Sequence, residues 1–115
     1  MFDLSIIIVS WNVRDLLARC LESISRSLQA EGTLTAEVIV VDSASTDGSA
    51  AMVAARFPWV RLLALKRNAG FTAGSNTGLR ESRGRYILLL NPDTEVISDA
   101  LARMVRFLEN HPDVA

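Results

Sequence analysis

Apolar residues recur along the chain in two alternating patterns. Short, almost continuous apolar runs at residues 4–9, 38–41, 60–65 and 86–90 predict strands, and those at 4–9 and 86–90 are typical of strands covered on both faces. Between the runs, apolar residues lie three and four positions apart, which predicts amphipathic helices at about 16–28, 50–57 and 72–82. A last helix is expected between Ser98 and His111-Pro112. We expect N-caps at Asn12, at Ser45 or Thr46, and at Ser98.

The predicted order of strands and helices defines the fold class. Each strand is followed by a helix, which requires a parallel sheet with right-handed crossovers and helices on both faces. We therefore expect an α/β fold, a three-layer α/β/α arrangement around a mostly parallel sheet. At 115 residues, the chain suits one small domain over residues 1–115.

Charge and cysteine content narrow the class of protein. A net charge of −1 and a pI near 5.8 argue against a general binder of nucleic acid or anionic membranes. The single cysteine, Cys20, rules out an intrachain disulfide and is expected to be buried. No apolar run reaches the ~18 residues of a membrane-spanning helix. We expect a cytoplasmic protein, with peripheral contact at the inner membrane left open.

The strand expected at 86–90 ends in a cluster of oxygen ligands. Pro92 cannot donate to a sheet ladder, so Asn91, Asp93 and Glu95 follow the end of this strand. Ligands of open α/β sheets bind at the carboxyl ends of the strands. Hard oxygen donors there suit Mg²⁺ or Mn²⁺ bridging to phosphate, although acids in a capped turn would give the same pattern.

Two other strand ends should meet this cluster at one edge of the sheet. The first is followed by Ser10-Trp11-Asn12 and the second by Asp42-Ser43. An aromatic, an acid and a metal ligand on one edge suit a nucleotide diphosphate. The base would lie near Trp11, with a hydrogen bond to Asp42. Taken singly, Trp11 fits a rim aromatic equally well, and Asp42 fits a turn residue.

A glycine-rich stretch precedes the fourth strand. Gly70, Gly74 and Gly78 recur every fourth residue, so in a helix they share a face that can approach backbone or ligand closely. Close helix–sheet packing and ligand contact are both compatible with this spacing. Asn68 and Asn76 are interpreted as polar groups near the ligand. No GxGxxG or GxxxxGK[ST] phosphate motif is present.

Four motifs occur in order and together resemble a known family. They are Ile7-Ile8-Val9-Ser10-Trp11-Asn12, Val40-Val41-Asp42-Ser43-Ala44-Ser45-Thr46-Asp47-Gly48-Ser49, Asn68-Ala69-Gly70-Phe71 with Asn76-Thr77-Gly78, and Leu90-Asn91-Pro92-Asp93-Thr94-Glu95. The chain resembles the nucleotide-binding half of family 2 inverting glycosyltransferases. These have the GT-A fold, and the branch resembled is the rhamnosyltransferase-like one, which acts on cell-surface polysaccharide.

The resemblance implies a donor site. Its substrate-binding residues would be Val9, Ser10, Trp11, Asn12, Asp42, Ser43, Asn68, Gly70, Asn76 and Asn91. Asp93 would contact Mg²⁺ or Mn²⁺ in a DxD-like motif, through the diphosphate of a UDP, dTDP or GDP sugar. The acceptor would be a saccharide. Two positions depart from the family: Ser43 follows Asp42 where a second acid is frequent, and Asn91 replaces the first acid of DxD.

The catalytic base of the family is a carboxylate beyond the metal motif, and no residue here matches it. We therefore expect the chain to be the donor-binding part of a longer enzyme, unable to transfer sugar alone. A flavodoxin-like binding or signalling module is the main alternative, but it needs an acidic pair after the first strand. A nucleotidyltransferase would carry a Gly- and Arg/Lys-rich loop there, and a purely structural domain is a further alternative.

Overall fold

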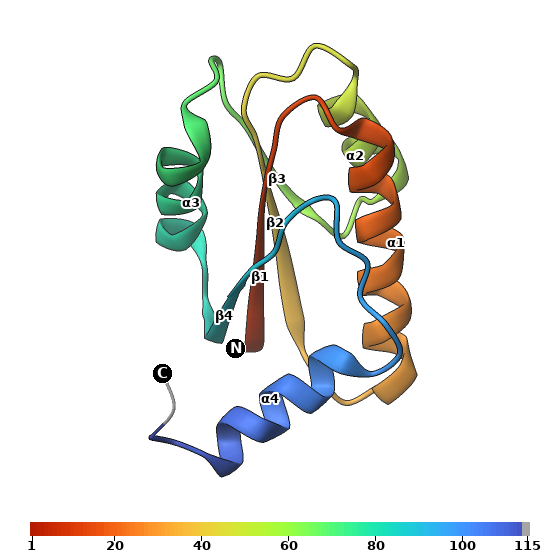
Figure 1. Ribbon diagram of the computed structural model, residues 1–115, viewed down its shortest axis with the longest axis vertical. Helices are drawn as coiled ribbons and strands as arrows, with labels where there is room; N and C mark the ends of the chain where they lie inside the picture. The colour runs from red at the N-terminus through yellow and green to blue at the C-terminus, as the bar shows by residue number, and fades with distance from the viewer. Residues whose placement is uncertain (114–115) are drawn as a thin grey trace.

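The computed structural model describes residues 1–113, without the side chain of Glu31; the last two residues of the expected domain lie outside that range. Strands and helices alternate, as the sequence predicts (Figure 1). The elements are β1 (Phe2–Ser10), α1 (Arg14–Glu31), β2 (Ala36–Asp42), α2 (Ser49–Arg56), β3 (Arg61–Ala64), α3 (Gly70–Glu81), β4 (Gly84–Leu89) and α4 (Ala100–Asn110).

The four strands form one sheet with the order β3-β2-β1-β4, and every neighbouring pair is parallel. The predicted α/β class with a parallel sheet is therefore confirmed. β1 lies in the interior of the sheet, where Ser10 is in register with Asp42 of β2. Since the strands are parallel, the loops that follow them all leave from the same edge of the sheet.

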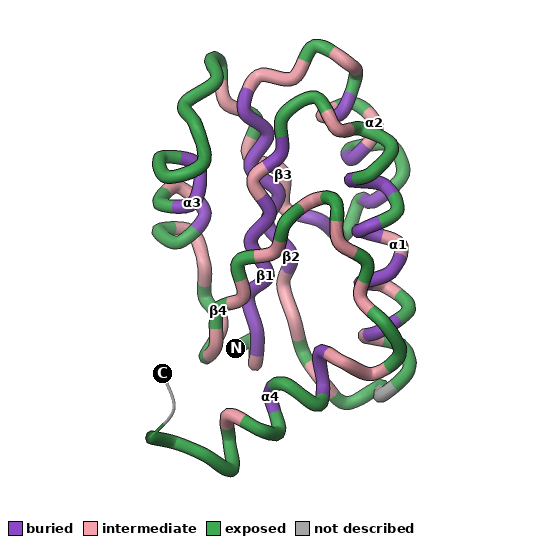
Figure 2. Tube along the Cα trace, viewed as in Figure 1, coloured by how far each residue is buried: buried purple, intermediate pink, exposed green. Residues whose placement is uncertain are grey.

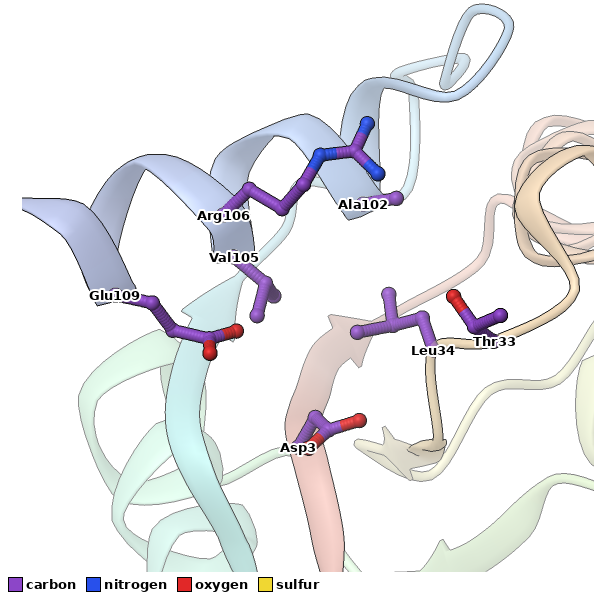
Figure 3. A pocket seen from close by; sticks show the side chains of 7 residues that line it. All are labelled: Asp3, Thr33, Leu34, Ala102, Val105, Arg106 and Glu109. Carbon is purple, nitrogen blue, oxygen red and sulfur yellow. The ribbon is translucent and has the colours of Figure 1, made fainter.

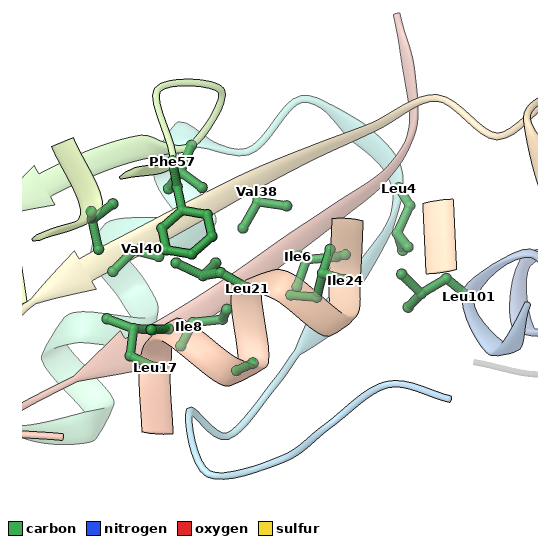
Figure 4. Packing of buried hydrophobic residues seen from close by; sticks show 14 of the residues in the cluster. Leu4, Ile6, Ile8, Leu17, Leu21, Ile24, Val38, Val40, Phe57 and Leu101 are labelled. Carbon is green, nitrogen blue, oxygen red and sulfur yellow. The ribbon is translucent and has the colours of Figure 1, made fainter. Parts of the chain in front are cut away.

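Helices cover both faces, which gives three layers. α1, α2 and α4 share one face, where they pack around an aliphatic cluster (Figures 1 and 4). The strands contribute alternate residues to this cluster, namely Leu4, Ile6, Ile8, Val38 and Val40. Cys20 of α1 belongs to the same cluster and is fully buried, as expected.

α3 lies on the opposite face, against β1 and β2. Two of its glycines allow a close approach. A Cβ on Gly74 would lie 2.7 Å from Cγ1 of Val9, and one on Gly78 would lie 2.5 Å from Cγ2 of Ile7. For Gly74 and Gly78 the structure supports close packing, because no larger residue fits at that distance.

The prediction that the fourth strand is buried on both faces is wrong. β4 is an edge strand, and none of its residues is buried (Figure 2). Ile87 is 48% exposed and Leu89 is 47% exposed. The reason is that α3 covers β1 and β2 instead, while β4 has a neighbour on one side alone.

The observed starts and caps of several elements also differ from the predicted ones. α3 begins at Gly70, two residues before the predicted start, and β4 begins at Gly84. The expected caps Asn12 and Ser98 both have a positive φ, of 52° and 51°, and the N-cap positions fall on the following residues, Val13 and Asp99. The cap of α2 is Gly48, and neither Ser45 nor Thr46 occupies it.

A groove of about 310 Å³ lies at the amino end of the sheet, far along the strands from the loops described below (Figure 3). It is lined by Asp3, Thr33, Leu34, Ala102, Val105, Arg106 and Glu109. None of the helices in the described part of the chain is long and apolar enough to cross a membrane.

Candidate nucleotide site at the carboxyl edge

The strand order reverses between β1 and β4. The chain passes from β1 to β2 and β3 in one direction, and then returns to place β4 on the other side of β1. The Leu90 amide donates to the Ile7 carbonyl at 2.9 Å, so the chain is still beside β1 just before Asn91. Such switch points leave a crevice at the carboxyl ends of the strands, where ligands of α/β sheets bind.

The loop after β1 is braced against the loop after β2. The Asn12 amide donates to Ser45 Oγ at 2.9 Å, and Asn12 Oδ1 accepts a hydrogen bond from the Thr46 amide at 2.8 Å. The left-handed φ of Asn12 is one that asparagine tolerates better than most residues. Asn12 therefore links two loops, which explains why it does not cap α1.

Asp42 is buried, with 3% of its surface exposed. Its Oδ1 accepts a hydrogen bond from Ser45 Oγ at 2.6 Å, and its Oδ2 accepts one from the Ser45 amide at 3.0 Å. The next amide, that of Ser43, donates to the Ser10 carbonyl at 2.9 Å. The side-chain hydroxyls of Ser10 and Ser43 are buried and have no hydrogen-bond partner within the described residues.

A second brace joins α1 to the start of α2. Asp47 Oδ1 accepts hydrogen bonds from the Ser49 hydroxyl at 2.5 Å and the Ser49 amide at 3.0 Å, while Oδ2 accepts one from the Arg14 amide at 3.0 Å. The Ser49 hydroxyl is the main cause that lowers the pKa of Asp47 below its usual value. Asp47 thus bonds to the first residue of α1 and to the first residue of α2.

The loop after β4 is anchored on α1. The main-chain oxygen of Asn91 accepts hydrogen bonds from the Thr94 amide at 3.1 Å and the Thr94 hydroxyl at 2.6 Å. Further along, the Val96 amide donates to Ser23 Oγ of α1 at 2.9 Å. Burial raises the pKa of the Cys20 thiol to about 11, and the nearby charges of Asp93 and Glu95 add to this.

These contacts leave the side chains of Asn91 and Asp93 exposed. Within the described residues, neither side chain makes a hydrogen bond or an ion pair. No group of three or more His, Cys, Asp or Glu side chains in that part of the chain could hold a metal ion alone.

The remaining predicted residues fall in two places. Trp11, at the end of β1, is 53% exposed at the central part of the edge. Asn68 and Gly70 lie after β3 at the same edge, where Asn68 Oδ1 accepts a hydrogen bond from the Gly70 amide at 3.0 Å. Asn76 lies midway along α3, and Val9 packs beneath Gly74, so these two are set back from the exposed loops.

Sequence reasoning missed the residues that hold the loops together. Ser45 and Thr46 were expected to cap a helix, and no role was given to Arg14. Their partners lie 33 or 34 positions away in the chain, so spacing alone does not reveal the contacts. The signal that could have found them is the pairing of Asn12 with a Ser- and Thr-rich loop after the neighbouring strand.

Comparison with known proteins places this fold and this edge in a family. The model of glycosyl transferase family 2 matches residues 5–115. The succinoglycan biosynthesis protein ExoO of Rhizobium meliloti (strain 1021) is 41% identical over 104 residues, which are 90% of this chain and 29% of ExoO. The glycosyltransferase YibD of Escherichia coli (strain K12) is 34% identical over 117 residues, 97% of this chain and 32% of YibD.

Solved structures share the fold. The mannosyltransferase PcManGT of Pyrobaculum calidifontis, in complex with GDP-Man and Mn²⁺, superposes with a TM-score of 0.77 at 28% identity, over 93% of this chain and 32% of PcManGT. S. aureus TarS in complex with UDP superposes with a TM-score of 0.78 at 23% identity, over 95% of this chain and 32% of TarS. The sheet is thus that of a GT-A glycosyltransferase, and the chain spans about a third of the length of these proteins. With the family model matching almost its entire length, this chain belongs to glycosyltransferase family 2.

Proposed function

We propose that the chain is the donor-binding part of a longer, inverting glycosyltransferase that takes its sugar from a nucleotide diphosphate. The observation that carries this proposal is the switch point at the carboxyl edge, with exposed Trp11 on one side and unpaired Asp93 on the other. The nucleoside would lie over the carboxyl ends of β1 and β2 and the loops that follow them, near residues 9–12, 42 and 43. Asn68, Gly70 and Asn76 would border it from the side of β3 and α3.

The diphosphate would lie toward β4. Asp93 offers a carboxylate and Asn91 an amide oxygen, and both are hard donors that suit Mg²⁺ or Mn²⁺. Because the described residues hold no cluster of three ligands, the diphosphate itself would complete the coordination. PcManGT, which shares the fold, was solved with GDP-Man and Mn²⁺, and this supports a divalent cation here. The cation would offset the charge of the leaving diphosphate.

The transfer needs an acceptor and a base. A general base removes the proton of the acceptor hydroxyl, its oxygen attacks the anomeric carbon, and the bond to the nucleotide diphosphate breaks with inversion. We propose that the base lies beyond residue 115 and that these 115 residues bind donor without transferring sugar. The acceptor would be a saccharide of a cell-surface polysaccharide, which the similarity to ExoO supports. We place the enzyme in the cytoplasm, or peripherally at the inner membrane.

Thermal unfolding with UDP, dTDP and GDP tests this function, each with and without Mn²⁺. At about 100 times Kd, binding adds about 2.7 kcal/mol of stability, a rise of several degrees in Tm. We expect such a rise with at least one nucleotide, dependent on Mn²⁺ and lost in Asp93→Asn. Glu109→Gln, an exposed acid at the opposite end of the sheet, is the matched control and should keep the rise. A folded protein that none of the nucleotides stabilises would contradict the proposal.

A further inference from the structure

The carboxylate of Asp42 is hydrogen-bonded within its own loop. Both carboxylate oxygens accept hydrogen bonds from Ser45, at 2.6 and 3.0 Å, and the residue is almost fully buried. With 3% of its surface exposed, Asp42 offers a base little surface to contact directly unless Ser45 moves away and its bonds break. Breaking a hydrogen bond to a buried charged group leaves that charge unsatisfied. The free-energy penalty is larger than the free energy gained from a hydrogen bond to a neutral base.

The hydrogen bonds continue from Ser45 to the loop after β1. Ser45 Oγ donates to Asp42 and accepts from the Asn12 amide at 2.9 Å, so one hydroxyl joins the two loops. Asn12 Oδ1 then accepts the Thr46 amide at 2.8 Å. These bonds hold Asn12 in place, and with it the neighbouring Trp11, an exposed aromatic of the edge.

We propose that Asp42 is a positioning residue that acts through Ser45, and that it does not itself contact the nucleoside. Its role is to hold the loops after β1 and β2 in the conformation in which Trp11 and the turn at residues 43–46 contact the base and ribose. This inference rests on the proposed function and replaces the direct contact with the base or ribose that was expected of Asp42. It makes Ser45, which was predicted only to cap a helix, a determinant of donor affinity.

A double-mutant cycle on nucleotide affinity tests this role. Kd is measured by calorimetry for UDP, dTDP and GDP with Mn²⁺, on the wild type, Asp42→Asn, Ser45→Ala and the double variant. If Asp42 acts through Ser45, each single variant weakens the affinity by about tenfold, the scale of a hydrogen bond to a charged group. The double variant should bind no more weakly than the weaker-binding single variant, because the bond from Ser45 Oγ to Asp42 is lost only once.

Specificity gives a second readout. If Asp42 only positions the loops, its loss lowers the affinity for every nucleotide that binds by the same factor. If Asp42 contacts the base, its loss changes the ratio of the Kd values of different nucleotides. Ser45→Thr, which keeps a hydroxyl, should restore most of the affinity. Ser82→Ala is the matched control, because it removes a hydroxyl bonded to a main-chain oxygen at the far end of α3.

Three results would overturn the inference. Additive losses in the double variant, or a changed nucleotide preference in Asp42→Asn, would show a direct contact. An unchanged Kd in both single variants would limit Asp42 to a stabilising role. If Asp42→Asn does not fold, Ser45→Ala and Ser45→Thr alone decide by their Kd values. If the wild type binds none of the nucleotides, both the proposed function and this inference are contradicted. The results named above for the variants contradict this inference alone.

Discussion

Two glycines determine how closely α3 approaches the sheet. Gly74 and Gly78 face Val9 and Ile7, and a Cβ at either position would meet these side chains at 2.7 and 2.5 Å. The result is a helix that lies directly over the carboxyl half of β1, beside the proposed donor site. The spacing of the glycines predicted a shared face, but the choice between packing and ligand contact needed their neighbours in three dimensions.

Gly78→Ala tests this contact. Overpacking costs about 1–3 kcal/mol, against about 1 kcal/mol that alanine contributes as a better helix former. Because the added Cβ would lie only 2.5 Å from Ile7, we take the upper part of the overpacking range, about 2–3 kcal/mol, and expect a net loss of about 1–2 kcal/mol in the free energy of unfolding, measured in urea. Thr72→Ala on the exposed side of α3 should cause no loss. A Gly78→Ala protein as stable as the wild type would contradict the account of this packing.

Cys20 is predicted to be unreactive in the folded protein. Its side chain is fully buried and its pKa is about 11, so the thiolate is scarce at pH 8. The thiol should react with a disulfide reagent at the rate at which the protein unfolds. Fast labelling of the native protein, at the rate of a free thiol, would contradict the packing of the loop after β4 on α1.

At the scale of elements, the loops carry information that periodicity does not. The strands and helices follow from their apolar spacing, since that spacing decides which face is buried. The loop conformations depend instead on contacts between residues more than 30 positions apart, such as Asn12 with Thr46. Sequence alone therefore predicted which residues lie at the carboxyl ends of the strands, but it misplaced the N-caps of the helices.

Asp47 makes the start of α2 sensitive to acid. The hydrogen bonds that it accepts lower its pKa, so the folded protein keeps it charged more readily than the unfolded chain does. Its contribution is therefore complete above the ordinary carboxyl pKa of about 4 and is lost as the pH falls through the lowered value. Asp47→Ala should cost about 1 kcal/mol at pH 7, as for lost N-terminal caps. Urea unfolding from pH 7 to pH 2.5 should show the difference from wild type shrink as the pH falls below about 4; a constant difference would contradict this.

The exposed face of β4 is predicted to promote self-association. Unpaired strand edges with exposed apolar residues bind one another, and Ile87 and Leu89 are both about half exposed on an edge strand. Ile87→Lys should lower the association measured by sedimentation equilibrium without a loss of stability. Leu88→Lys, on the core-facing side of the same strand, should unfold the protein instead. Equal association of the wild type and Ile87→Lys would contradict a role for this edge.

At the scale of the whole molecule, the fold was predictable from the sequence, but the exposure of the edge strand β4 was not. Alternating strand and helix patterns lead to a parallel sheet with helices on both faces, and the structure has it. The apolar run at 86–90 predicted a buried strand, because an apolar composition is compatible with burial on both faces. Whether a strand is in fact covered depends on the elements that pack beside it. The candidate site was predicted as a set of strand ends, because parallel topology alone brings these to one edge. How Asp42 and Asn12 are used there depends on side-chain contacts that only the structure supplies.

The central claim is that a nucleotide diphosphate binds with a divalent cation at the carboxyl edge, between the loops after β1 and β4. Amide chemical-shift mapping of the ¹⁵N-labelled protein during titration with nucleotide and Mg²⁺ tests it most directly. The account predicts shifts concentrated at residues 10–13, 42–48 and 91–95, with little change around Asp3, Leu34 and Glu109 in the groove at the amino end (Figure 3). Shifts centred on that groove, or none at saturating nucleotide, would contradict it.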